Sequence, residues 1–229
     1  MSKTIIITGA NGHLGSAVVD QLLADGWTVE AVLGPWGELN TDRERLHCQA
    51  VDLLDEGAVH DYLDAVRRRH ARIDGAALIA GGFAMSALPD TSTEALDKMI
   101  DLNFRTAFHL VRPLYRQFAE QDGGGRFVFI GARPAFHPGS GSGTFAYALS
   151  KGMLRQLAEL INAGPHRQAV RAAVIAPSII DTPANREAMP DSDFDDWVPP
   201  ARIAEGIRFL LSDAGHMLHH PVLEIYHRS

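Results

Sequence analysis

Tyr147 and Lys151 are the residues of this chain whose types and spacing best support acid–base chemistry. They lie four positions apart in Tyr147-Ala148-Leu149-Ser150-Lys151, so on a helix their side chains share one face. A nearby ammonium favours the phenolate and is expected to lower the pKa of the tyrosine. Such a tyrosine can donate a proton to a carbonyl oxygen, or take one from an alcohol, while a hydride is transferred. The pair therefore predicts a catalytic centre, the alternative being an exposed tyrosine with an unrelated lysine.

A glycine-rich turn near the start of the chain is suited to hold a pyrophosphate. The apolar run 3–8 leads straight into glycines spaced Gly9-x-x-Gly12-x-x-Gly15. Such glycines allow a tight turn, close approach of the backbone to a pyrophosphate, and close contact between helix and strand. The N–H groups at the start of the following helix then point at the anion. The expected dinucleotide contacts in this turn are Gly9, Asn11, Gly12, His13, Leu14 and Gly15.

The residues after the second expected strand bear on the choice of cofactor. An acidic residue there would bond the ribose hydroxyls of NAD, but Val32-Leu33-Gly34-Pro35-Trp36-Gly37 contains none. Arg43, Arg45 and His13 are candidate partners for a 2′-phosphate. The sequence therefore weakly favours NADP and leaves NAD open.

Strand and helix patterns alternate along the whole chain, as in an α/β protein. A capping box, Thr91-Ser92-Thr93-Glu94, opens the longest helical stretch. Repeated strand–helix units predict a doubly wound parallel sheet of about seven strands with helices on both faces. Strands are expected at 3–8, 28–33, 46–51, 75–80, 126–130, 170–176 and 222–226, and helices at 12–25, 55–70, 91–120, 145–162 and 199–211.

No linker or repeat divides the chain, so residues 1–229 are expected to form a single domain. The acidic segment 183–199, which contains Trp197, follows the sixth expected strand. Such a loop beside a cofactor often closes over a substrate as a lid. We therefore expect it to be the substrate loop, the alternative being a solvated connector.

Composition excludes several classes of function. The net charge of -7 argues against binding to nucleic acid or to anionic membranes. No apolar run approaches the roughly 20 residues that span a bilayer. A single cysteine, Cys48, fits a reducing compartment, so a cytoplasmic location is expected. The run His216-x-x-His219-His220 lacks an accompanying carboxylate or cysteine, and no metal site is predicted.

The glycine turn, the Tyr147–Lys151 pair and the segment Pro177-Ser178-Ile179-Ile180-Asp181-Thr182 together resemble the short-chain dehydrogenase/reductase superfamily over essentially the whole chain. The resemblance implies a Rossmann-type fold and an NAD(P)-dependent oxidoreductase. It implies that Asn103 holds a relay water and that Lys151 also binds the nicotinamide ribose. Further cofactor contacts implied by the resemblance are Asp52, Leu53, Ala80, Gly81, Gly82, Pro177, Ile180 and Thr182.

One position departs from the family pattern. A serine that holds the substrate oxygen usually follows the fifth strand, whereas this chain has Ala132 in Gly131-Ala132-Arg133. Loss of one donor to a developing oxyanion typically costs roughly 3 kcal/mol of barrier. Ser140, Ser142 and Thr144 are nearby candidates to replace it.

Within the superfamily, several segments resemble the dihydropteridine reductases, which also lack that serine. These are Ala80–Ala84, Gly131–Ala135, Asp181–Arg186, Met189-Pro190 and Asp193-Phe194-x-x-Trp197. The resemblance implies reduction of a flat conjugated heterocycle such as a quinonoid pterin, with quinones and carbonyl compounds as related substrates. Expected substrate contacts are Phe83, Ala132, Ser142, Tyr147 and Trp197.

Two alternatives remain at this stage. The first is a non-catalytic regulator that binds the dinucleotide and senses its redox state. The second is a biosynthetic ketoreductase or alcohol dehydrogenase that anchors the substrate oxygen through Ser140 or Ser142. The resemblance also implies a homodimer or homotetramer, joined through the helices at 91–120 and 145–162. The other expected partner is a small-molecule substrate.

Overall fold

The structure is a computed structural model that describes residues 2–34, 39–219 and 222–228. One seven-stranded sheet in the order β3-β2-β1-β4-β5-β6-β7 forms its centre, and every pair of neighbouring strands is parallel. This confirms the expected doubly wound architecture. The strands are β1 (Thr4–Thr8), β2 (Thr28–Leu33), β3 (Leu46–Ala50), β4 (Gly75–Leu78), β5 (Gly125–Ile130), β6 (Val170–Pro177) and β7 (Val222–Ile225).

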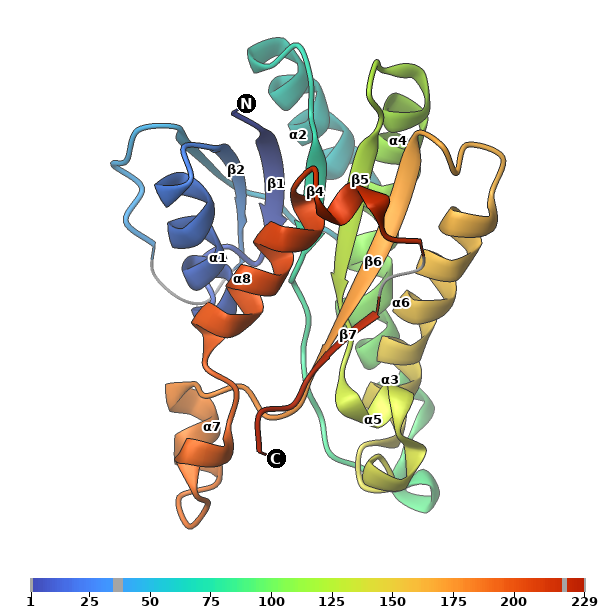
Figure 1. Cartoon of the computed structure of the whole chain (residues 1–229). Helices are drawn as coiled ribbons and strands as arrows, with labels where there is room; N and C mark the ends of the chain where they lie inside the picture. The colour runs from blue at the N-terminus through green and yellow to red at the C-terminus, as the bar shows by residue number, and fades with distance from the viewer. Residues whose placement is uncertain (1, 35–38, 220–221, 229) are drawn as a thin grey trace.

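Two layers of helices cover the sheet (Figure 1). On one face, α1 (His13–Ala24) and α8 (Pro200–Leu211) pack against residues such as Ile7, Val128 and Ile175. On the other face, α2 (Glu56–Arg69), α4 (Thr106–Glu120) and α6 (Phe145–Ala163) bury Ile6, Phe127 and Val174. Because both faces are covered, the central strands are continuous apolar runs rather than alternating ones.

The strand order reverses between β1 and β4, which are neighbours although β2 and β3 lie between them in sequence. In open α/β sheets, the crevice at the carboxyl ends of the strands beside such a reversal is where ligands bind. The glycine turn follows β1 and Gly81 follows β4, so both lie at this point.

The fourth strand is shorter than expected, because it ends at Leu78 rather than at residue 80. The backbone N–H groups of Ile79 and Ala80 both donate to Thr8 Oγ1, at 3.0 Å each, instead of continuing the sheet. The chain therefore leaves the sheet directly over the end of β1.

The helix expected over 91–120 is divided into three parts. The helix α3 (Thr93–Ile100) passes into a π-helical turn, η2 (Asp101–Arg105), before α4 begins. Ser92 caps α3 by accepting from the backbone N–H of Ala95, as the capping box predicts. The π turn contains Asn103, and single π turns within helices frequently mark functional sites.

Short segments that the sequence analysis did not predict surround the carboxyl ends of the strands. Figure 1 shows α5 (Arg133–Phe136) and α7 (Pro183–Ala188) at this end of the molecule, on opposite sides, with the C-terminal segment between them. Four 3₁₀ turns complete the described elements: η1 (Leu88–Asp90), η3 (Pro138–Ser140), η4 (Phe194–Asp196) and η5 (Gly215–Met217).

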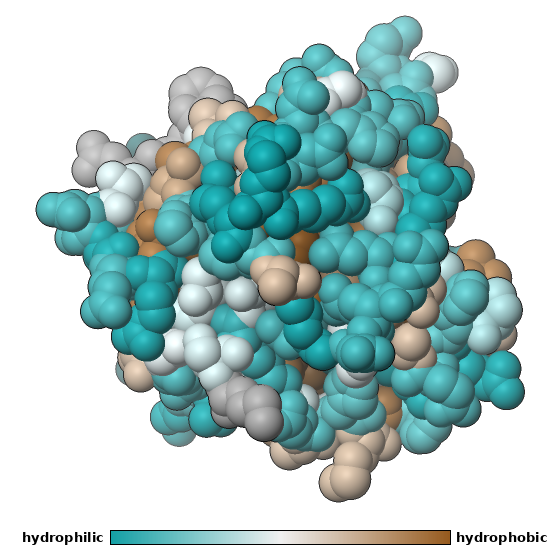
Figure 2. Space-filling model, turned by 90° about the horizontal axis from the view of Figure 1, so that it is seen from above, coloured by the Kyte–Doolittle hydropathy of each residue, from teal (hydrophilic) through white to brown (hydrophobic). Residues whose placement is uncertain are grey.

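The opposite end of the molecule, at which β1 begins, presents a predominantly hydrophilic surface (Figure 2). Within the described ranges, no helix has the length and apolar character needed to cross a membrane. Pro35, Trp36, Gly37 and His220, which entered the sequence analysis, lie outside the described residues.

Candidate active site

The glycine turn after β1 has the geometry of a phosphate cradle. Gly9 has a φ of +64°, in the left-handed region that side chains disfavour, and a Cβ there would lie 3.1 Å from the backbone of Ala80. A Cβ on Gly15 would lie 2.1 Å from the Gly9 carbonyl oxygen, so α1 packs directly against the turn. Among the described residues no side chain caps the N-terminus of α1, and the first turn of this helix carries no acid. The helix start can therefore receive the pyrophosphate of a dinucleotide.

Asn11 ties this turn to the end of β2. Its Nδ2 donates to the Gly34 carbonyl oxygen at 3.0 Å, and its Oδ1 accepts from the Gly34 N–H at 2.8 Å. Leu14 and Gly15 are buried beneath the turn, whereas His13 is exposed at the start of α1. The Asn11 side chain thus holds the glycine turn against the end of β2. His13 remains accessible beside the turn.

The structure corrects one expectation about the 2′-phosphate. Arg45 lies at the amino-terminal end of β2, where its Nη1 donates to the Gly26 carbonyl oxygen at 3.2 Å and its own carbonyl accepts from Val29. A ribose bound beside the glycine turn would lie at the other end of that strand, so Arg45 is at the end of β2 remote from the turn. Arg43 forms an ion pair with Asp20 on α1. His13, the third candidate partner for a 2′-phosphate, is the first residue of α1 and directly follows the glycine turn. It therefore remains a candidate.

Asn103 clamps the segment that follows β4. Its Oδ1 accepts from the Gly82 N–H at 3.0 Å, and its Nδ2 lies 3.1 Å from the Gly82 carbonyl oxygen. A Cβ on Gly81 would lie 2.5 Å from Asn103 Oδ1 and 3.2 Å from Lys151 Nζ. Any side chain at position 81 would therefore collide with Asn103 and crowd Lys151, which explains the glycine there.

A buried polar chain links Asn103 to the start of α6. Asn103 Nδ2 donates to Ser150 Oγ at 3.0 Å, and Ser150 Oγ donates to the Tyr147 carbonyl oxygen at 2.8 Å. Asn103 is 1% exposed and Ser150 is 0% exposed. Ser150 is not among the site residues predicted from the sequence. Its position three residues after Tyr147, on the same helical face, was the available signal.

Lys151 and Tyr147 lie on one face of α6, as expected. Lys151 Nζ donates to the Ile130 carbonyl oxygen at 2.8 Å and lies 6.0 Å from the centre of the Tyr147 ring. The ring of Phe83 meets Tyr147 edge-on, with ring centres 4.9 Å apart. The side chain of Phe83 is 62% exposed, so it offers an aromatic face beside the tyrosine.

Burial, rather than mutual attraction, sets the protonation of this pair in the structure. Burial lowers the pKa of Lys151 from 10.5 to about 8 and raises the pKa of Tyr147 from 10.0 to about 12. The spacing of the pair predicts that the ammonium lowers the pKa of Tyr147, but in the structure that pKa is raised. The physical reason is that both charged forms lose hydration, and Lys151 directs a hydrogen bond to Ile130 rather than to the phenol.

Ala132 lies at the end of β5, where the family pattern has a serine, and it is 3% exposed. Ser140 Oγ donates to the His137 carbonyl oxygen at 2.8 Å, and Thr144 Oγ1 lies 3.3 Å from the Gly141 carbonyl oxygen. Ser142 is exposed just before α6. Two of the three candidate replacements therefore have local backbone partners.

The remaining predicted cofactor residues lie at the ends of strands. Asp52 Oδ1 accepts from the Leu54 N–H at 2.9 Å, and the Leu53 carbonyl accepts from His109 Nδ1 at 2.9 Å. Pro177 ends β6. Thr182 caps α7 by accepting from the Asn185 N–H at 3.2 Å. Asn185 Nδ2 in turn donates to the Ile180 carbonyl at 2.7 Å.

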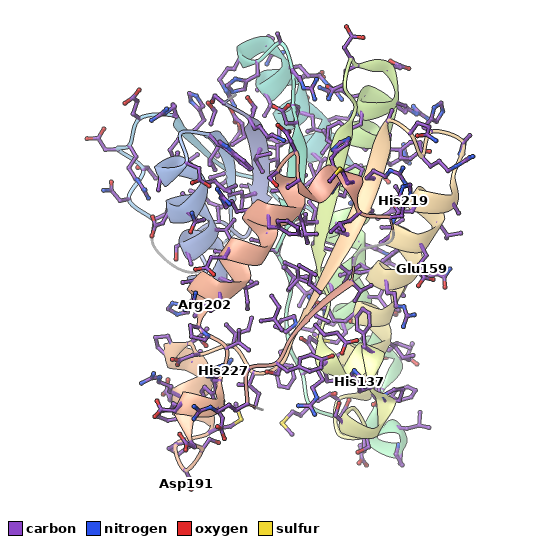
Figure 3. The ribbon with its side chains drawn as sticks, in the orientation of Figure 1. His137, Glu159, Asp191, Arg202, His219 and His227 are labelled. Atoms are coloured by element: carbon purple, nitrogen blue, oxygen red, sulfur yellow. The ribbon has the colours of Figure 1, made fainter. Side chains whose placement is uncertain are left out.

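The segment 183–199 is closed at its base by main-chain pairing. Asp181 N–H donates to the Val198 carbonyl at 2.9 Å, and Val198 N–H donates to the Ile179 carbonyl at 2.8 Å. Trp197 is 3% exposed and packs against Phe194, with ring centres 4.8 Å apart. Asp191 lies at the outer tip and points away from the molecule (Figure 3). Trp197 is therefore an anchor of the loop in this structure.

The C-terminal segment packs against α5, which the sequence analysis missed. His137 Nε2 donates to Glu224 at 2.9 Å, and the Arg133 guanidinium lies over the Tyr226 ring at 5.0 Å. Figure 3 shows His137 on one side of this end of the molecule and His227 in the C-terminal segment. No local sequence pattern predicts these contacts, because the two segments are far apart in sequence.

Comparison with known proteins defines the class. The profile of the short chain dehydrogenase family matches residues 3–193. This chain belongs to that family and is an NAD(P)-dependent oxidoreductase of the Rossmann type.

Individual relatives are similar over most of their length. The dihydropteridine reductase of Dictyostelium discoideum is 27% identical over 212 residues, covering 90% of this chain and 86% of the relative. The sorbitol-6-phosphate 2-dehydrogenase of Klebsiella pneumoniae is 25% identical, covering 82% and 74%. Among solved structures, NADP-bound ElxO superposes with a TM-score of 0.88 at 19% identity, covering 98% of this chain and 97% of that one.

Proposed function

We propose that this protein reduces a small conjugated molecule with a hydride from NAD(P)H, and that Tyr147 donates the accompanying proton. The observation that carries the proposal is the buried chain from Asn103 through Ser150 to the start of α6. This chain of hydrogen bonds holds the start of α6, with Tyr147 and Lys151, near the carboxyl ends of the strands. The glycine turn at Gly9 and the glycines Gly81 and Gly82 lie at the same end.

Each residue has a distinct part in the proposed reaction. The bound nicotinamide supplies the hydride, and the turn at Gly9, Gly12 and Gly15 holds its pyrophosphate. Lys151, held by the Ile130 carbonyl, binds the nicotinamide ribose and stabilises the phenolate that forms when the proton leaves. Since the pKa of Tyr147 is about 12, its hydroxyl is protonated at neutral pH and is ready to donate. Asn103 supports the relay that returns the proton.

The substrate class follows from what surrounds Tyr147. Ala132 supplies no hydroxyl to hold an isolated carbonyl oxygen, which would cost an ordinary ketone roughly 3 kcal/mol of transition-state stabilisation. A conjugated ring delocalises the developing charge and depends less on that donor. The exposed Phe83, edge-on to Tyr147, can pack against a flat ring. The similarity to a dihydropteridine reductase supports a pterin-like heterocycle or a quinone.

We propose NADP as the preferred cofactor. The described end of β2, Leu33 and Gly34, offers no carboxylate to the ribose, and His13 is exposed at the start of α1, where a 2′-phosphate could meet it. The fold neighbour ElxO was solved with NADP.

The test follows oxidation of NADPH, and separately of NADH, with quinonoid dihydropterin, then with quinones and diketones. We expect Tyr147→Phe to lower kcat by about 10²–10⁴-fold while leaving the dissociation constant for NADPH unchanged. Cofactor binding without turnover on any substrate, and unaltered by Tyr147→Phe, would contradict the proposal and favour a dinucleotide sensor.

A ketoreductase that uses Ser142 is the second candidate, because this exposed serine precedes α6 directly. In that case Ser142→Ala should abolish activity on diketones while leaving pterin reduction intact. Ser140→Ala is the matched control, since the Ser140 hydroxyl already donates to the His137 carbonyl. Equal activity of both variants on every substrate would exclude this candidate.

We also propose a homo-oligomer in the cytoplasm, with 183–199 as a substrate loop. Leu110, Leu114 and Phe118 of α4 are fully buried core residues, whereas Phe108, Leu149 and Leu160 are 37%, 47% and 62% exposed on α4 and α6. These exposed apolar side chains support a helix-pair interface. The single cysteine supports a reducing compartment.

A further inference from the structure

Glu30, His47 and His70 form a cluster on the sheet, separate from the candidate active site. Glu30 in β2 and His47 in β3 are direct partners in the parallel register, so their side chains project from the same face of the sheet. His70 follows the last residue of α2, the helix that covers this face. One ligand atom from each residue lies within 4.8 Å of the other two.

The Glu30 carboxylate is buried and held in a fixed orientation. Its side chain is 1% exposed, and Arg69 donates to it twice, from Nε to Oε1 at 3.0 Å and from Nη2 to Oε2 at 2.6 Å. The Tyr62 hydroxyl donates to the Glu30 carbonyl at 3.3 Å and fixes the backbone. Because each carboxylate oxygen can accept two bonds, Oε1 keeps a lone pair directed at His70 Nε2, 2.6 Å away.

The two imidazoles give the cluster an open side. The His70 side chain is 16% exposed, and His47 is exposed on β3, which is the edge strand. Their ring centres are 5.5 Å apart. Among the described residues His47 has this ring contact and no hydrogen bond, so one of its ring nitrogens is available as a ligand. A cation can reach the cluster from solvent at the sheet edge.

We propose that Glu30, His47 and His70 bind a zinc-type divalent transition-metal ion, with solvent completing the coordination. Two imidazoles and one carboxylate are a common three-ligand set for Zn²⁺, and they disfavour Mg²⁺ and Ca²⁺, which prefer oxygen ligands. Ligand-to-metal distances of about 2.0–2.1 Å in a tetrahedral site place two ligand atoms roughly 3.3–3.4 Å apart. The His70 imidazole must therefore withdraw from its present 2.6 Å contact with Glu30 Oε1 to admit the ion. The ion then lies between these two atoms, in place of their hydrogen bond.

Arg69 has two opposing effects on this site. Its hydrogen bonds orient the carboxylate, as outer-shell partners of metal ligands do. Its positive charge repels the cation, so the affinity should be lower than that of a structural zinc site. The ion would join the edge strand β3 to β2 and to the end of α2, and so stabilise the folded state.

The experiment is a calorimetric titration of the chelator-treated full chain with zinc chloride. We expect one ion per chain, and a rise in thermal midpoint on saturation. His47→Ala should weaken binding by about tenfold or more, and it is a mild change because this side chain is exposed. His60→Ala, which removes an exposed histidine from α2, is the matched control and should bind zinc as the wild type does.

Two other results would overturn the proposal. One is the absence of saturable binding by the wild-type chain. The other is loss of binding in His219→Ala but not in His47→Ala, which would place the ion at the histidines before β7. X-ray absorption of the loaded chain provides an independent readout. It should show nitrogen and oxygen neighbours and no sulfur, since Cys48 packs on the opposite face of the sheet.

Discussion

At the scale of single residues, burial decides the chemistry of Tyr147 and Lys151. The tyrosine is kept protonated by a pKa of about 12, and the lysine is brought closer to neutrality by a pKa of about 8. The proposed proton donor and the proposed ribose-binding cation can therefore coexist at neutral pH, since neither needs to change its charge before a cofactor binds.

Lys151 should leave a signature in the pH dependence of stability. Its folded-state pKa of about 8 lies below the unfolded value of 10.5, so between these pH values the unfolded chain binds more protons. The free energy of unfolding should then rise with pH through this window, by up to about 1.4 kcal/mol per pH unit. Urea titrations of the wild type and Lys151→Met measure it. A difference between the two that stays constant from pH 7 to 10 would contradict the assignment.

Ser150 should matter for both stability and activity. Ser150→Ala removes the acceptor for Asn103 Nδ2 and the donor to the Tyr147 carbonyl, so we expect a loss of about 1–3 kcal/mol in the free energy of unfolding. The kcat should fall while the affinity for cofactor is retained, because Ser150 is not in the phosphate cradle. The exposed Ser142→Ala is the control in urea denaturation and should change stability by less than about 0.5 kcal/mol.

At the scale of elements, the candidate active site is assembled from the ends of strands and one interrupted helix. The early exit of β4, forced by the two bonds to Thr8 Oγ1, brings Gly81 and Gly82 over β1. The π turn then places Asn103 opposite these glycines. Both features contribute to the same contact, that between Asn103 and Gly82.

Gly81→Ala tests this contact directly. The added Cβ would lie 2.5 Å from Asn103 Oδ1 and 3.2 Å from Lys151 Nζ, so both side chains must shift. Because displacements of about 1 Å can cost roughly 10²-fold in rate, we expect kcat/KM to fall by one to two orders of magnitude. Gly139→Ala is the control, since nothing lies within 4 Å of a Cβ at that position. Equal activity of the two variants would show that the contact is not required.

At the scale of the whole molecule, the parallel strands give the protein two chemically different ends. The carboxyl ends of the strands carry the candidate active site and the short helices α5 and α7, whereas the amino-terminal end is predominantly hydrophilic (Figure 2). The exposed apolar residues Phe108, Leu149 and Leu160 of α4 and α6 lie outside the hydrophobic core, at the surface proposed above as a helix-pair interface.

A charge at that surface should change the oligomeric state. Leu160 is 62% exposed near the end of α6, so Leu160→Glu should not disturb the monomer core but would bury an unpaired carboxylate in a helix-pair interface. Light scattering coupled to size-exclusion chromatography should show a dimer or tetramer for the wild type and a smaller species for the variant. Phe209→Glu, on α8 and 39% exposed, is the control, and an equal response of the two variants would argue against the helix-pair interface.

The sequence alone predicts the sheet and the order of its strands correctly, and its motifs also indicate the principal candidate site residues. Continuous apolar strands, helix caps and the Gly9, Tyr147 and Lys151 motifs are local patterns, and local patterns are readable without long-range information. The missing serine at Ala132 is different, because it is recognised only through the resemblance to the family's pattern after the fifth strand.

The pKa values and the side-chain contacts of those residues depend on the tertiary structure. The pKa values of Tyr147 and Lys151 depend on burial by distant segments, and the bond from Asn103 to Ser150 spans two helices. The sequence left Arg45 as a candidate ligand for the 2′-phosphate. The register of β2 and β3 places it at the amino-terminal end of β2, away from the glycine turn. The cluster of Glu30, His47 and His70 likewise exists because parallel pairing and the end of α2 bring together residues that are 40 positions apart along the chain at most. Sequence spacing fixes only short-range neighbours, whereas solvation and side-chain contacts are set by the packed fold.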